Sequence, residues 1–292
     1  MTRFILVRKA LRDVRGATIG IGLTAFVIAL VDMLVFPAYK ETLKNFDLGS
    51  VMKGFLGEAG SFATLEGYLT GEFFSWVPLL MIIGAIIGGT AALAGEESDG
   101  TMDLLLAQPV TRTRLVLEKA AGLLLAVTAM ALVSLPGFAL GAVFGSLTDH
   151  LGQVWPAVVN MLPVTFLFLT LSLWASAALP TRGAAAAAAT GAAVLTYFLN
   201  LLGASVSWLD MPRKLSPFYW SDASRILLHG FDWLRAGALL ALAALFLALA
   251  VWSFERRDLA PGAREWSVRS LLAARLPHRR PTGEPRRVAK PI

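Results

Sequence analysis

Six long apolar segments interrupt the sequence, and each is about as long as a helix that crosses a lipid bilayer. A helix rises about 1.5 Å per residue, so a hydrocarbon core of about 30 Å requires about 20 mainly apolar residues. Charged residues make up 16% of the chain, against about 25% in soluble domains. We therefore predict an all-α, polytopic membrane protein. Its six transmembrane helices are expected at residues 17–36, 74–95, 120–147, 154–179, 184–202 and 233–254.

The basic residues between these segments predict the orientation of the chain, because loops that stay in the cytoplasm retain an excess of Lys and Arg. Most of the 26 Lys and Arg residues lie before the first segment, between the second and third, and after the sixth. We expect a multi-pass protein of the cell inner membrane with both termini in the cytoplasm. Residues 1–260 would form the transmembrane domain, and residues 261–292 a basic cytoplasmic tail that is partly disordered.

The same distribution explains the net charge of +6. Basic groups on the inner face of a membrane attract anionic lipid head groups. Membrane lipids, and not nucleic acid, are therefore the expected partners of these residues.

An amphipathic helix is predicted at the N-terminus. Phe4, Val7, Leu11 and Val14 follow one another at intervals of three or four, with basic residues around them. This pattern is typical of a helix that lies in the interface of a membrane.

The sequence lacks the common motifs of catalysis. Neither the phosphate-binding pattern GxxxxGK[ST], the zinc pattern HExxH nor the serine pattern GxSxG occurs in it. Cysteine is absent, which excludes disulfides and thiolate chemistry. We expect no catalytic residue, no metal site and no cofactor in this chain.

Glycines recur at helical spacing in two of the apolar segments, and such faces let helices approach closely. They serve either packing inside one chain or a dimer seam with a second copy, and the sequence leaves both open. The residues are Gly84, Gly88, Gly137, Gly141 and Gly145.

Asp32 is the clear acidic residue within the apolar segments. A charge inside a membrane is a candidate functional group. Near the outer end of the first helix, however, Asp32 can also reach the outer head groups. Both interpretations, a pathway residue and a head-group contact, remain open.

A short helix is predicted between the second and third apolar segments. Ser98 or Asp99 can cap it, Asp103 suits its positive N-terminal end, and Pro109 prevents much continuation. The expected helix has about two turns.

This helix would carry Met102, Leu104, Leu105 and Leu106 on a cytoplasmic loop. Contiguous exposed apolar groups are unfavourable unless something covers them. They either fold back onto the inner ends of the spans or dock into a soluble partner, and the physical argument favours neither.

The segment resembles the corresponding loop of type-2 ATP-binding cassette (ABC) permeases. Met102 stands where that family usually has Leu. The likeness extends to Arg8 and Lys9, to the six-span layout and to residues 254–259. The residues that match the loop pattern are Glu96, Glu97, Gly100, Thr101, Asp103, Leu104, Leu105, Pro109, Thr111, Arg112 and Lys119.

The resemblance implies that the short helix is a coupling helix seated in a groove of a cytoplasmic ATPase. It also implies that a second permease copy, identical or related, pairs with the chain, and that the partner ATPase binds ATP and Mg. Met102, Leu104 and Leu105 would then transmit contact, while Glu96, Glu97 and Arg112 would fix the loop through charge pairs.

We expect the permease subunit of an exporter on this basis. The alternatives are a secondary transporter, which should show inverted repeats, or a non-catalytic membrane scaffold.

Overall fold

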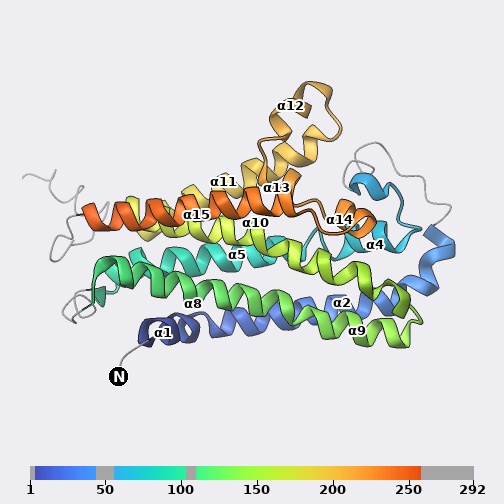
Figure 1. Cartoon of the computed structure of the whole chain (residues 1–292), viewed down its shortest axis with the longest axis horizontal. Coiled ribbons are helices and arrows are strands. Elements are labelled where there is room, and N and C mark those ends of the chain that lie inside the picture. Colours follow the sequence, from blue (N-terminus) through green and yellow to red (C-terminus); the bar gives the residue numbers. More distant parts are fainter. Residues whose placement is uncertain (1–3, 44–55, 103–109, 258–292) are drawn as a thin grey trace, which may run out of the picture. The chain divides into compact units, whose positions relative to one another are not determined.

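The computed structural model describes residues 4–43, 56–102 and 110–257 of the chain (Figure 1). Helices form most of these residues, and no strand occurs among them. The predicted coupling residues Asp103, Leu104, Leu105 and Pro109 lie outside the described residues, as does the tail from residue 261 to residue 292.

Six helical segments are long and apolar enough to cross a membrane. Each overlaps one of the predicted spans, so the all-α, six-span fold class is confirmed. The segments are Arg15–Leu43, Leu65–Ser98, Arg112–Phe144, Thr148–Ala178, Arg182–Gly203 and Trp233–Arg256.

Several segments consist of more than one helix. The third breaks between α8 and α9 around Val133, three residues before Pro136, whose ring prevents a regular helix through that turn. The elements that build the six segments are α2 (Arg15–Leu43), α4 (Leu65–Glu72), α5 (Val77–Thr90), η2 (Ala91–Gly95), α6 (Glu96–Ser98), α8 (Arg112–Leu132), α9 (Ser134–Phe144), η3 (Thr148–His150), α10 (Leu151–Ala178), α11 (Arg182–Gly203) and α15 (Trp233–Arg256).

Short helices occupy the connections. The N-terminal α1 (Ile5–Asp13) lies at the same end of the bundle as α6 and the last turn of α15, and we call this the α6 end (Figure 1). The opposite end holds α4 and α14, and we call it the α14 end. The remaining short elements are η1 (Gly57–Ala59), η4 (Ser207–Leu209), α12 (Asp210–Arg213), α13 (Pro217–Trp220) and α14 (Ala223–His229).

The fourth span, α10, is the centre of the bundle. It packs against α15, α5, α11 and α8, and most of its residues are buried. Phe168 of α10 lies in an apolar core with Ile82 and Ile86 of α5 and Leu239 of α15. By contrast, few residues of α11 and α15 are fully buried, as expected of helices that face lipid or another subunit.

The N-terminal α1 is present, but its buried face differs from the predicted apolar row. Leu6, Val7 and Ala10 are buried, whereas Phe4 is exposed. The reason is that α1 packs against α8. Gly122 of α8 has no side chain to obstruct this approach, and a Cβ there would lie 2.8 Å from the Ala10 Cβ.

Candidate functional site

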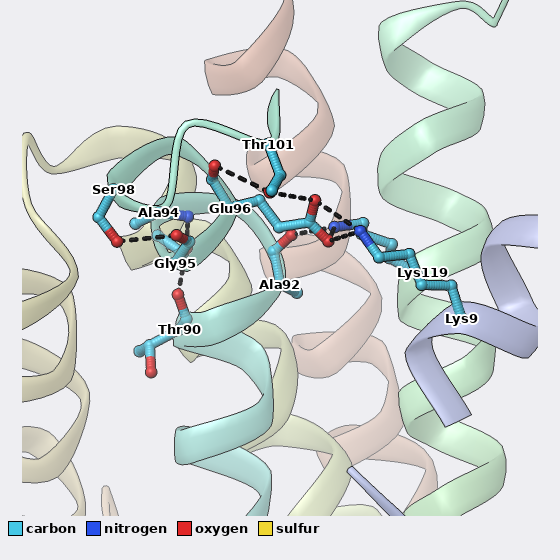
Figure 2. A network of polar contacts seen from close by, with 10 residues as sticks. Lys9, Thr90, Ala92, Ala94, Gly95, Glu96, Ser98, Thr101 and Lys119 are labelled. Atoms are coloured by element: carbon cyan, nitrogen blue, oxygen red, sulfur yellow. Dashed lines mark hydrogen bonds and ion pairs between the residues drawn. The ribbon is translucent and has the colours of Figure 1, made fainter. Parts of the chain in front are cut away.

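Four polar side chains converge at the α6 end, and we call Lys9, Glu96, Thr101 and Lys119 the Glu96 cluster (Figure 2). The Lys119 ammonium lies 2.6 Å from Glu96 Oε1. The Lys9 ammonium lies 2.7 Å from the same oxygen and 2.9 Å from Oε2. The Thr101 hydroxyl donates to Oε2 at 3.1 Å. One carboxylate therefore joins α1, α6 and α8.

The Glu96 carboxylate and the Lys119 ammonium are both buried, so each needs the other as a partner. The Lys119 side chain is 2% exposed and Glu96 is buried. Removing two charges from water is unfavourable unless they are paired and hydrogen bonded. The cluster meets this requirement, because Lys119 also donates to the carbonyl of Ala92.

Ala92 belongs to η2, a single π-helical turn between α5 and α6. Ser176 of α10 inserts into this turn: its hydroxyl accepts from the Ala94 amide at 2.8 Å and donates to the Thr90 carbonyl at 3.1 Å. Such turns leave backbone groups without ladder partners and occur often at functional sites. Here a neighbouring helix supplies the missing partners.

A second set of contacts holds both ends of the segment from residue 96 to residue 112. Arg257 pairs with Glu97 at 3.0 Å and donates to the carbonyls of Ser176 and Ala177. Arg112 donates to the Arg257 carbonyl at 2.7 Å. The two ends of the segment are thus bonded to α10 and to the end of α15.

The structure brings several predicted coupling residues together and gives each a partner or a special conformation. Glu96, Glu97 and Thr101 form the contacts described above, and Gly100 has φ of +69°, which favours glycine. Arg112 donates hydrogen bonds to backbone carbonyls at the end of α15. It forms no ion pair among the described residues. Met102 is 3% exposed, so it packs within its own chain.

Sequence reasoning did not assign roles to Arg257 and Ser176. Arg257 carried a weak signal, because it lies in the run that resembles the family. Ser176 carried none, since a serine in an apolar segment is ordinarily bonded within its own helix. Lys9 and Lys119 matched the family pattern, but nothing indicated that they share one carboxylate.

The predicted glycine faces contact helices of the same chain. A Cβ at Gly141 would lie 2.7 Å from the Met33 Cβ of α2, and one at Gly84 would lie 2.6 Å from Ile21 of α2. Gly88 faces Leu123 and Val14, while Gly137 and Gly145 face backbone carbonyls of α2. Small residues here let α5 and α9 approach α2 closely.

Asp32 lies in the interior of the described chain and is 7% exposed. Its Oδ2 has no hydrogen-bond partner among the described residues. An unpartnered buried carboxylate oxygen is unusual in a folded protein, so Asp32 keeps its standing as a candidate pathway residue.

These features define a multi-pass, all-helical membrane protein with a polar cluster at one end of its bundle. A sequence model described as "ABC-2 family transporter protein" matches residues 4–259, so the chain belongs to the ABC-2 transporter family. Membrane-spanning permease subunits of ABC transporters characterise this family, and the resemblance drawn from the loop is confirmed. No individually curated protein matched the chain in comparison.

Proposed function

We propose that this permease is the membrane-spanning part of an exporter driven by a separate ATPase subunit, which docks on the segment between Glu96 and Arg112. The observation that carries the proposal is the set of bonds around that segment. Through Glu96, Glu97 and Arg112 its ends are tied to α1, α8, α10 and α15. A partner that displaces the segment therefore displaces the helices of the bundle.

The contacts of the Glu96 cluster would couple motion of the ATPase to motion of the spans. The ATPase binds ATP and Mg and changes shape, and the segment with Leu104 and Leu105 moves with it. The Glu96 cluster transmits this motion to α5 and α8, because a buried ion pair resists separation. Tilting of these spans opens an outward path for the substrate.

The proposed topology places the α6 end in the cytoplasm of a cell with an inner membrane. The excess of Lys and Arg in the N-terminal and C-terminal segments and in the first turns of α8 supports it. The α14 end, with α4 and the segment from α12 to α14, then faces the outside.

A second permease copy completes the proposed assembly. The uncovered apolar faces of α11 and α15 support it, since Leu195, Leu202, Leu240 and Leu245 are exposed within one chain. Exposed apolar patches of this kind face either lipid or a partner subunit. Two permeases and two ATPases would form the transporter.

Retention of the ATPase tests the docking proposal. The full chain with both Leu104→Asp and Leu105→Asp is co-expressed with its cognate ATPase, and the ATPase retained on an affinity-tagged permease is measured. We expect retention to fall about tenfold or more, because an unpaired carboxylate is unfavourable when docking removes it from water. Undiminished retention contradicts docking at these residues.

A matched control separates docking from a general effect of charge on an exposed leucine. Leu215 lies between α12 and α13 and is exposed. Leu215→Asp is expected to leave ATPase retention unchanged, because α12 and α13 lie at the side of the bundle, away from the α6 end (Figure 1). An equal loss from this control also contradicts the proposal.

A further inference from the structure

A cavity lined by both apolar and polar side chains lies between α5, α10, α11 and the segment from α12 to α14. Its volume is about 110 Å³. A water molecule needs about 10–15 Å³ on this scale, so the cavity has room for about seven to eleven groups of that size. Neither the Glu96 cluster nor Asp32 lines it, and the proposed coupling mechanism assigns it no role.

Asn160 of α10 gives the cavity a hydrogen-bond acceptor that is unpaired among the described residues. The residue is 2% exposed, and its amide nitrogen donates to the Ser221 carbonyl at 3.2 Å. Because that neighbour is an acceptor, the Asn160 oxygen must be the other atom of the amide. This oxygen has no partner among the described residues, so the site calls for a ligand that donates an N–H or O–H group.

Two opposite charges line the same cavity. Arg213 donates through Nε to Asn200 at 3.3 Å and lies over the Tyr219 ring, but no carboxylate pairs with it among the described residues. Asp222 accepts hydrogen bonds from the amide and hydroxyl of Ser224. Within residues 4–43, 56–102 and 110–257, it forms no ion pair with a cationic side chain. A ligand that carries both an anion and a hydrogen-bonding cation would complement this pair.

An apolar groove continues from the cavity. The groove has a volume of about 410 Å³ and runs between α5 and α11, and it shares Leu79 and Tyr197 with the cavity. Ile83, Ile87 and Phe198 line it and are about half exposed. Hydrocarbon chains can therefore enter the groove from the side of the bundle.

We propose that the cavity and the groove together bind a phospholipid with a phosphoethanolamine head group. The phosphate lies against Arg213, the primary ammonium donates to Asn160 and Asp222, and an acyl chain occupies the groove between α5 and α11. This inference rests on the proposed function, because it names the class of ligand that the permease takes from the bilayer.

Lipid retention measured by native mass spectrometry tests this assignment. The full chain is exchanged into nanodiscs of phosphatidylethanolamine, phosphatidylcholine or phosphatidylglycerol, and lipids that stay bound after release are counted. Phosphatidylethanolamine is expected to be retained about tenfold more than the other two. Phosphatidylcholine lacks an N–H donor, phosphatidylglycerol lacks the cation, and each loses a charged hydrogen bond.

Variants locate the bound lipid. Asn160→Leu removes the acceptor at similar volume, and Asp222→Asn removes the charge while keeping an oxygen that caps Ser224. Both are expected to lower retention of phosphatidylethanolamine about tenfold. Thr170→Val on the same helix changes a buried residue that lines none of these hollows and is expected to retain the lipid as the wild type does.

Equal retention of the three lipids, or wild-type retention by Asp222→Asn, overturns the assignment. Should Asn160→Leu fail to fold, Asp222→Asn still decides, because it preserves the cap of α14. ATPase retention by the same variants separates this inference from the proposed function. Variants that lose lipid selectivity but retain the ATPase normally would support the lipid site without testing the docking proposal.

Discussion

Lys119 carries a charge in the interior of the bundle, and its position shows why the cluster depends on Glu96. The Lys119 ammonium has Glu96 as its acidic partner, and Lys9 bonds the same carboxylate from a half-exposed position. Loss of Lys9 leaves the buried pair intact. Loss of the Glu96 charge leaves a buried ammonium without a counter-charge, which is the expensive case.

Glu96→Gln is therefore predicted to be much more destabilising than Lys9→Met. Breaking a buried pair by removing one partner destabilises by about 3–5 kcal/mol. Lys9→Met removes a partly exposed ammonium and leaves Glu96 paired with the buried Lys119, so its effect is expected to be smaller. Thermal unfolding of the full chain in detergent measures both. Equal unfolding midpoints for the two variants would show that the buried pair does not stabilise the α6 end.

The π-helical turn η2 depends on a hydroxyl from another element. Ser176→Ala removes the acceptor of the buried Ala94 amide and is expected to destabilise the protein by about 1–3 kcal/mol, the usual effect of an unsatisfied buried group. Thermal unfolding measures this loss, and faster hydrogen exchange at the Ala94 amide locates it.

Thr170→Val provides the control for η2 on the same helix. The Thr170 hydroxyl donates to carbonyls of its own helix, Phe166 at 3.0 Å and Leu167 at 3.1 Å. These carbonyls can keep their helical partners without it, so a small effect is expected. A Thr170→Val variant as unstable as Ser176→Ala would mean that the bond between helices has no special importance.

Close packing of α9 on α2 is a property of the two helices and of the glycines between them. Gly141→Ala is predicted to destabilise by about 1–3 kcal/mol, the range for overpacking a filled interface. Its Cβ would lie 2.8 Å from the Leu30 carbonyl oxygen, and a backbone atom cannot turn away as a side chain can. Unfolding of the purified chain in detergent reports the change.

Gly152→Ala is the matched comparison for this packing. A Cβ at Gly152 of α10 would meet nothing within 4 Å. Alanine also favours helix over glycine by up to about 1 kcal/mol. A neutral or mildly stabilising effect is expected there, and a Gly141→Ala variant that unfolds like Gly152→Ala would contradict the close approach of α9 and α2.

At the scale of the molecule, the membrane spans were largely predictable because long apolar segments are a local signal. The starts of three spans also have local caps, since Thr111, Thr181 and Asp232 each accept a backbone N–H of the following turn. The third span was predicted to start at residue 120, yet its helix starts at Arg112. Charged residues in its first two turns lowered the apolar content that the prediction followed.

The polar site was less predictable because its contacts join distant parts of the chain. Lys9 and Glu96 are separated by 87 positions, and Arg257 and Glu97 by 160. Family resemblance selected Glu96, Glu97 and Arg112 as important, but spacing along the chain cannot reveal such partners. The insertion of Ser176 into η2 and the displaced face of α1 likewise depend on tertiary packing.

The absence of cysteine from the chain allows docking to be tested by cross-linking at single positions. A cysteine introduced as Leu104→Cys, in the full chain with its ATPase, is joined to that partner by a short thiol-to-amine reagent. Asp149→Cys, in the exposed η3 at the α14 end, serves as the reference position. We predict a cross-linked permease and ATPase from Leu104→Cys and none from Asp149→Cys. Cross-linking from Asp149→Cys alone, or from neither position, would contradict docking of an ATPase at the α6 end.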